Sequence, residues 1–260
     1  MAIVTYKFDE SYKLSRTLVV GGWVAEEKQW RRVGKLWQKA IAYENRSLPA
    51  NRKISRYHAA KMNANEGEYK GWENEQYRKV RFTKKLLKIV SNGKMAAITC
   101  GIDLKAFFSV FKGNDPKDLS VPYVLCMKML MVQIAKALQR EPGAEHYRVA
   151  LIHDHGDWDK QALEGYNALV DDVNWEHRHR FVSITPLTWR DDVGLQPADL
   201  IAYESMRWLD DHLWSGKDMR KPLKELTGMS EHIYGSYIDR GALELLKTEI
   251  EKKNQNEEAV

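Results

Sequence analysis

The stretch Val149-Ala150-Leu151-Ile152-His153 lies within an apolar run, residues 147–153, that has the length of one buried strand. A helical pattern at 158–173, a second apolar run at 181–185 and a helical pattern at 197–214 follow it. Strand, helix, strand and helix in this order predict parallel strands whose connections are covered by helices. The second half of the chain therefore indicates an α/β fold.

The beginning of the chain predicts further strands. Residues 3–8 and 17–24 are apolar runs joined by a short polar turn around residues 11–15, which predicts a hairpin. Residues 95–102 predict another buried strand, and residues 122–139 predict a strongly apolar, central helix. The whole pattern predicts a mixed α/β sheet flanked by helices.

Between the hairpin and the strand at 95–102 lies a basic helical insertion, about residues 26–92. From Lys28 to Lys94 the chain has 18 Lys and Arg against five Glu and no Asp, a formal charge of +13. Since the whole chain carries +5, the remainder carries −8. This asymmetry suits a polyanion such as nucleic acid held beside an acidic site. Helices whose charged residues only face solvent explain it equally well.

Length and composition indicate an ordinary globular protein. The chain has 260 residues, of which 43% are hydrophobic and 30% charged. We expect one α/β domain, residues 1–215, followed by a helical extension, residues 216–260, with a disordered tail. Apolar residues in the C-terminal helices suggest a possible homodimer.

The sequence predicts neither a membrane segment nor a signal peptide. The most apolar stretch, 121–138, contains Lys128, Gln133 and Lys136, and is therefore expected to be a buried helix. The N-terminus opens directly into a strand pattern. Cys100 and Cys126 lie in apolar segments and fit a protein core in a reducing compartment. We expect a cytoplasmic protein.

Three aspartates flank or interrupt apolar runs. Asp9 follows residues 3–8, Asp154 follows the strand at 147–153, and Asp199 interrupts the apolar stretch 195–202. A carboxylate beside a buried run costs several kcal/mol unless a partner or a cation compensates its charge. If the three converge, they repel one another and bind a divalent metal.

Each aspartate also has an ordinary structural explanation. Asp9 suits a turn after its strand. Asp154 suits the N-cap of the following helix. Asp199 suits the first turn of its own helix. One shared site accounts for all three at once, and we prefer it.

Four short motifs stand out in the sequence. They are Phe8-Asp9-Glu10-Ser11, Tyr57-His58-Ala59, Ile152-His153-Asp154 and Leu195-Gln196-Pro197-Ala198-Asp199-Leu200-Ile201-Ala202. Together they resemble a bacterial family, the domain-of-unknown-function family 3800, which is placed among the ribonuclease H-like folds. The similarity spans roughly residues 3–210, and the last motif is the most specific.

The resemblance implies a ribonuclease H-like mixed sheet with a carboxylate cluster at one end. The cluster has one aspartate on the first strand, one after a later parallel strand and one on the final core helix, positions that Asp9, Asp154 and Asp199 fill. Ribonuclease H-like enzymes bind two divalent cations in such a cluster and hydrolyse phosphodiesters.

The chain departs from the plain ribonuclease H order in two ways. Only two strands precede the first helix, so basic helices are inserted before the third strand. No glutamate occupies the position normally supplied by the first helix, which leaves Glu10, Asp103 or His58 as candidates for the fourth ligand.

Hydrolysis of a phosphodiester needs an activated water and neutralisation of the leaving oxygen. Two Mg²⁺ or Mn²⁺ ions about 3.5–4 Å apart supply both, and such hard cations prefer oxygen ligands. We expect Asp9 to bridge both ions, Asp154 and Asp199 to complete one site each, and His58 to orient water or relay a proton.

Three functions follow from these residues. The first is a metal-dependent nuclease or phosphodiesterase acting on DNA or RNA. The second is a catalytically silent nucleic-acid-binding module with the same fold. The third is a metal-dependent hydrolase of a small phosphate ester.

Overall fold

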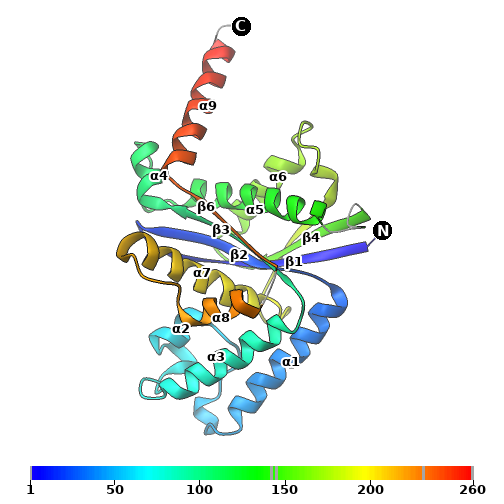
Figure 1. The fold of residues 1–260 in the computed structure, drawn as a ribbon, viewed down its shortest axis with the longest axis vertical. Coiled ribbons are helices and arrows are strands. Elements are labelled where there is room, and N and C mark those ends of the chain that lie inside the picture. Colours follow the sequence, from blue (N-terminus) through cyan, green and yellow to red (C-terminus); the bar gives the residue numbers. More distant parts are fainter. Residues whose placement is uncertain (1, 141–142, 144–145, 230–231, 259–260) are drawn as a thin grey trace.

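A six-stranded mixed sheet forms the centre of the molecule (Figure 1). The computed structural model describes residues 2–140, 143, 146–229 and 232–258. The strands lie in the order β5-β4-β1-β2-β3-β6, in which β2 is antiparallel to β1 and β3 and the other neighbouring pairs are parallel. Their bounds are β1 Ala2–Lys13, β2 Thr17–Glu26, β3 Ala96–Asp103, β4 Tyr147–Asp154, β5 Phe181–Leu187 and β6 Ile233–Ile238.

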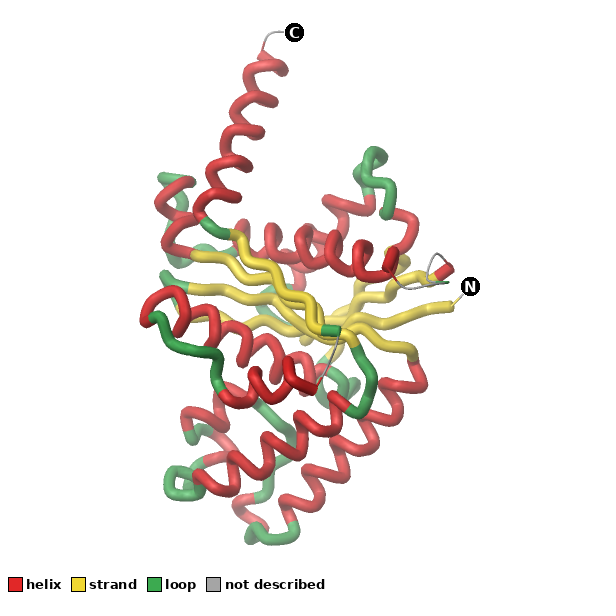
Figure 2. Tube along the Cα trace, viewed as in Figure 1, coloured by secondary structure: helices red, strands yellow, loops and turns green. Residues whose placement is uncertain are grey.

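Helices cover both faces of the sheet (Figure 2). Helices α4, α5 and α6 lie on one face, and α1, α2, α3, α7 and α8 on the other. The predicted mixed α/β fold, with helices on both faces and basic helices inserted before the third strand, is confirmed. The bounds are α1 Glu27–Asn45, α2 Ala59–Ala64, α3 Gln76–Ser91, α4 Leu104–Val110, α5 Ser120–Arg140, α6 Asp159–Val170, α7 Leu195–Ser215, α8 Lys221–Met229 and α9 Arg240–Glu258.

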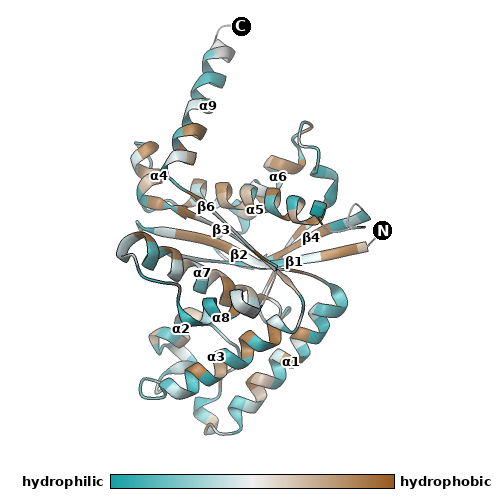
Figure 3. Cartoon of the chain, viewed as in Figure 1, coloured by the Kyte–Doolittle hydropathy of each residue, from teal (hydrophilic) through white to brown (hydrophobic). Residues whose placement is uncertain are grey.

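Alternate side chains of β1 lie on opposite faces of the sheet. Tyr6 and Phe8 pack in the core on the α5 face. Lys7 points to the other face, where its ammonium group contacts Asp192 before α7 and lies over the Trp30 ring of α1. This alternation, which any β-strand shows, fixes the face on which Asp9 lies. The strands β2 and β3 are among the most apolar segments of the molecule (Figure 3).

Helix α5 is the predicted central helix. By length and composition it could cross a membrane, but 56% of its most apolar window is buried inside the protein. It packs against β2, β3 and α6, and its contacts are those of a core helix. The expectation of a buried helix here is confirmed.

The C-terminal region differs from the expected helical extension. It contributes β6, which pairs in parallel with β3 at the edge of the sheet. Sequence patterning missed this strand because it is short and includes Gly235 and Ser236, which have low strand propensity. Helix α9 then extends away from the body through Glu258, where a disordered tail was expected (Figure 1). Residues 259 and 260 lie outside the described part of the chain.

Gly22 makes the hairpin possible. The strands β1 and β2 pair in continuous register from Val4 to Lys13, through the two adjacent glycines of β2. A Cβ on Gly22 would lie 1.9 Å from the carbonyl oxygen of Lys7 on the neighbouring strand. The glycine is therefore required by close approach of two backbones.

Replacing Gly22 is expected to destabilise the protein. Gly22→Ala should lower the free energy of unfolding by at least about 3 kcal/mol, because β1 or β2 must move to accommodate the methyl group. Denaturant unfolding measures the change. Gly228→Ala in α8 is the matched control, since a Cβ there meets no atom within 4 Å; equal stability of the two variants would contradict the argument.

Candidate active site

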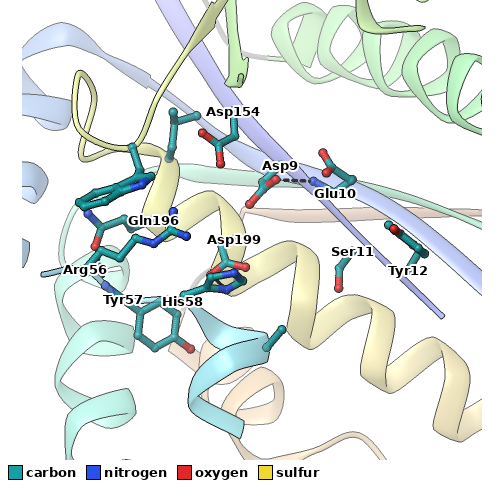
Figure 4. A pocket seen from close by; sticks show the side chains of 13 residues that line it. Asp9, Glu10, Ser11, Tyr12, Arg56, Tyr57, His58, Asp154, Gln196 and Asp199 are labelled. Atoms are coloured by element: carbon teal, nitrogen blue, oxygen red, sulfur yellow. Dashed lines mark hydrogen bonds and ion pairs between the residues drawn. The ribbon is translucent and has the colours of Figure 1, made fainter. Parts of the chain in front are cut away.

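Sheet geometry brings Asp9 and Asp154 together. The parallel strands β1 and β4 pair as far as Phe8 and His153, whose rings stack with centroids 5.6 Å apart. The next residues, Asp9 and Asp154, therefore lie at the same level, and alternation turns both away from α5 and toward α7. Figure 4 shows the two carboxylates facing each other at this point.

Asp199 reaches the same place from α7. Its Oδ2 accepts a hydrogen bond of 2.7 Å from the backbone N–H of Ala59, the first residue of α2. The Nδ1 of His58 lies 3.5 Å from the same oxygen. The three aspartates, Glu10 and His58 line one open pocket of about 280 Å³ (Figure 4).

The first turn of α7 holds this arrangement in place. Gln196 Oε1 accepts hydrogen bonds from Trp37 Nε1 of α1 at 3.0 Å and from the backbone N–H of Tyr57 at 2.8 Å. The Pro197 carbonyl accepts a bond of 2.9 Å from Trp23 Nε1 of β2. Leu195–Ala202 thus joins the sheet, the inserted helices and the loop before α2, and most of its side chains are buried.

The carboxylates raise one another's pKa values. Burial raises the pKa of Asp9 well above its usual range, and the charges of Glu10, Asp199 and Asp154 raise it further. Burial also raises the pKa of Asp154, although the Arg56 guanidinium opposes that shift. The pKa of Glu10 is raised to about 7, first by burial and then by the charge of Asp154. This is the mutual repulsion expected of converging aspartates.

The ordinary structural explanations fit these aspartates poorly. The N-cap of α6 is Trp158, so Asp154 does not cap the following helix. Asp199 is the fifth residue of α7, beyond its first turn, and it accepts a bond from α2. Asp9 lies inside β1, which continues to Lys13, and accepts a local bond of 2.8 Å from the N–H of Glu10.

Asp103, a candidate fourth ligand, is not brought to the pocket. It ends β3 and is the N-cap of α4, accepting a bond of 2.9 Å from the N–H of Ala106. The cause is the sheet order, which places β2 between β3 and β1. Glu10 does line the pocket, although alternation along β1 turns its side chain to the opposite face from Asp9.

The histidines beside Asp154 point elsewhere. His153 is buried, and its Nδ1 lies 3.0 Å from the Asp154 carbonyl oxygen. His155 Nδ1 lies 2.5 Å from Asp159 Oδ2, at the start of α6. Neither histidine lines the pocket.

Arg56 is a pocket residue that the sequence did not single out. It lies in the irregular segment before α2, and its guanidinium is 4.8 Å from the centroid of the Trp189 ring. The Tyr69 hydroxyl holds this segment by donating a bond of 2.8 Å to the Arg56 carbonyl. The sequence feature that could have identified Arg56 is its position two residues before His58, within the basic insertion. Arg56 brings a positive charge into the pocket that the three aspartates line (Figure 4).

Comparisons with known proteins give weak similarities. No protein-family model matches the chain, and no curated protein is significantly similar to it. The crystal structure of Bst-RNase HIII in complex with Mn²⁺ is 12% identical with a TM-score of 0.43, over 79% of this chain and 52% of that one. RNase HII in the PCNA:RNase HII complex from Archaeoglobus fulgidus is 13% identical with a TM-score of 0.39, over 88% and 87%. The chain spans about half the length of the RNase HIII chain, and likeness at this level assigns no activity.

The stability of the protein is expected to depend on the pH through Glu10. Because the pKa of Glu10 is raised from 4.5 to about 7, the folded protein binds this proton more tightly than the unfolded chain does. The stabilisation is complete below pH 4.5 and is lost as the pH rises through about 7. We expect the free energy of unfolding to fall by on the order of 2 kcal/mol over that interval.

Denaturant unfolding at a series of pH values, with a chelator present, measures this fall. Glu10→Gln should make the profile less steep between pH 4.5 and 7, because one titrating group is gone while Asp9 and Asp154, whose pKa values are also raised, remain. An unchanged profile in that variant would show that other groups cause the pH dependence.

Proposed function

We propose that this protein is a divalent-metal-dependent nuclease or phosphodiesterase that works at the pocket of Asp9, Asp154 and Asp199. The observation that carries the proposal is the convergence of these aspartates from β1, β4 and α7, with two of them raised in pKa by burial and by their neighbours' charges. Half-buried carboxylates that are not neutralised by cations lower the stability of a folded protein. Because this group lowers stability, we infer that it is retained for function.

The donor set fits Mg²⁺ or Mn²⁺. Carboxylate oxygens are the ligands that hard cations prefer, and the pocket offers no Cys for a zinc site. Among the described residues, no group of three or more His, Cys, Asp or Glu stands ready to hold an ion. Binding would therefore require the three aspartate side chains to rotate toward a common point.

Each residue has a role in this proposal. Asp9, on the central strand, is the bridging ligand, Asp154 and Asp199 are the outer ligands, and Glu10 is the fourth candidate that lines the pocket. A bound divalent cation would lower the pKa of water and neutralise charge on the leaving oxygen.

His58 and Arg56 supply the remaining chemistry. His58 is held by its contact with Asp199 and is 27% exposed in its side chain, so it can accept a proton from water at the mouth of the pocket. Arg56 offers its guanidinium to a phosphate oxygen. The resemblance to the domain-of-unknown-function family 3800 stays a prediction.

Cleavage assays with Mg²⁺ or Mn²⁺ test the proposal. Wild-type protein should cut DNA or RNA, and replacing Asp9 or Asp199 by Asn should abolish the cutting. Activity on mononucleotide esters but not on polymers would favour a small phosphate-ester hydrolase. Metal-independent binding of nucleic acid without cutting would favour the silent binding module.

A further inference from the structure

A second, larger cavity lies beside the site pocket. This groove, which we call the α1 groove, has a volume of about 980 Å³ and lies between α1 and the loop at residues 189–193. Trp189 and Gln196 line both cavities, so the groove begins where the site pocket ends. Its volume is at the upper end of the range for small-molecule pockets, and it is larger than the site pocket itself.

The wall of the α1 groove has cations that can bind an anion. Lys7, Arg31, Lys35 and Arg190 line it, against three carboxylates. The carboxylates are engaged within the protein: Asp192 contacts Lys7 at 2.5 Å, Asp191 accepts from Thr188 and Glu27 contacts Arg31 at 2.8 Å.

The ion pair between Glu27 and Arg31 is too weak to prevent Arg31 from binding an anion. Its side chains are 63% and 79% exposed, so the pair contributes less than about 1 kcal/mol. Arg31 can therefore exchange Glu27 for a phosphate. Lys35 is exposed one turn further along α1, so the two cations follow one another along the groove wall.

Trp189 stands at the junction of the two cavities. The guanidinium groups of Arg56 and Arg190 lie 4.8 and 4.6 Å from the centroid of its ring. Arg56 belongs to the site pocket and Arg190 to the α1 groove. The indole thus holds two arginines in succession along the passage from the carboxylates to α1.

We propose that one strand of a polynucleotide passes from the site pocket, across Trp189, into the α1 groove. Arg56, Arg190, Arg31 and Lys35 then contact successive phosphates. This inference rests on the proposed function. It adds that the substrate is a polymer and states which path its strand takes across the protein. A series of phosphate contacts made by Lys and Arg, with an aromatic ring beside them, is how proteins hold single strands without reading the sequence.

The basic residues of α3 are assigned no part in this path. Lys84 contacts Glu225 at 3.7 Å, and Lys85 lies 3.8 Å from the centroid of the Tyr43 ring. Neither lines the site pocket or the α1 groove. In the proposed path the insertion therefore contributes cations from α1 and from the segment before α2, and none from α3.

Salt-dependent binding tests the path. Fluorescence anisotropy with a labelled single-stranded oligonucleotide is measured over a series of salt concentrations, with Asp9→Asn in every protein so that the strand is not cut. Arg31→Gln/Lys35→Gln should reduce the slope of log affinity against log salt by about 1.4, at roughly 0.7 per lost phosphate contact. Arg32→Gln/Lys39→Gln is the matched control: the same charges are removed from exposed positions of α1 outside the groove, and the slope should stay unchanged.

Cleavage of the same oligonucleotide by the wild-type protein is assayed in parallel. The two assays together test the strand path and the nuclease proposal independently. If wild type cuts but the two double variants have equal slopes, the path is wrong and the nuclease proposal stands. If wild type does not cut, yet only the Arg31/Lys35 variant loses slope, the path stands and the nuclease proposal fails. Absence of binding in all three proteins overturns the path, whichever way the cleavage assay turns out.

Discussion

Asp9→Asn is expected to reduce metal-dependent cleavage by at least about 1,000-fold, which corresponds to roughly 4 kcal/mol in the activation free energy. The amide keeps the size of the side chain and its hydrogen bond from the N–H of Glu10, but it removes the charge that would bridge two cations. Initial rates on labelled DNA and RNA with Mg²⁺ or Mn²⁺ measure the loss.

The same replacement is expected to stabilise the protein. Above pH 7 and without divalent metal, the free energy of unfolding should rise by on the order of 1–2 kcal/mol, because burial and three neighbouring carboxylates disfavour the Asp9 charge. Reduced activity together with increased stability would distinguish a functional carboxylate from a structural one, since removal of a structural carboxylate lowers both.

Asp157→Asn is the matched control for Asp9. Asp157 lies three residues beyond Asp154, is exposed and does not line the pocket. Its replacement should leave the rate and the stability unchanged. A rate for Asp9→Asn equal to that of the control would mean that the cleavage site lies elsewhere.

Gln196→Met is expected to lower the free energy of unfolding by about 2–4 kcal/mol. Gln196 is 4% exposed, and its Oε1 accepts from both Trp37 Nε1 and the Tyr57 N–H. Methionine has nearly the same shape but cannot accept either bond, so two buried donors lose their partner at about 1–3 kcal/mol each. The segment with Arg56 and His58 would lose its attachment to α7.

Thermal and denaturant unfolding measure this effect, and the cleavage rate reports the loss of the attached segment. Gln255→Met is the control, because Gln255 is an exposed residue of α9 and lines neither the site pocket nor the α1 groove. If Gln196→Met were as stable as Gln255→Met, the two bonds to Gln196 would contribute nothing to the fold.

Most of the framework could be predicted from short-range sequence patterns. The hairpin, the strands β3, β4 and β5, and the helices α5 and α7 have apolar periodicities that depend only on neighbouring residues. That Asp9 and Asp154 each follow an apolar strand pattern is also visible locally, whereas their convergence depends on the pairing of β1 with β4.

The other half of the site could not be predicted in this way. Arg56 and Trp189 lie in irregular segments, 133 residues apart in numbering, whose positions depend on Tyr69, Gln196 and the packing of the insertion. No periodicity exists in such loops. The expectation of Asp103 as a fourth ligand was wrong for a related reason. The sequence shows that Asp103 ends a strand, but only the strand order shows that β2 separates this strand from β1.

The insertion has a consequence for any attempt to shorten the protein. Its side chains Trp37, Tyr57 and Trp72 belong to the core on the α7 face of the sheet, and the segment before α2 supplies Arg56 and leads to the amide that binds Asp199. A truncated chain in which β2 led straight into β3 would expose one flank of α7 to water and open the pocket on that side. The segment that looks like an optional addition is thus indispensable, and a minimal working fragment has to retain it.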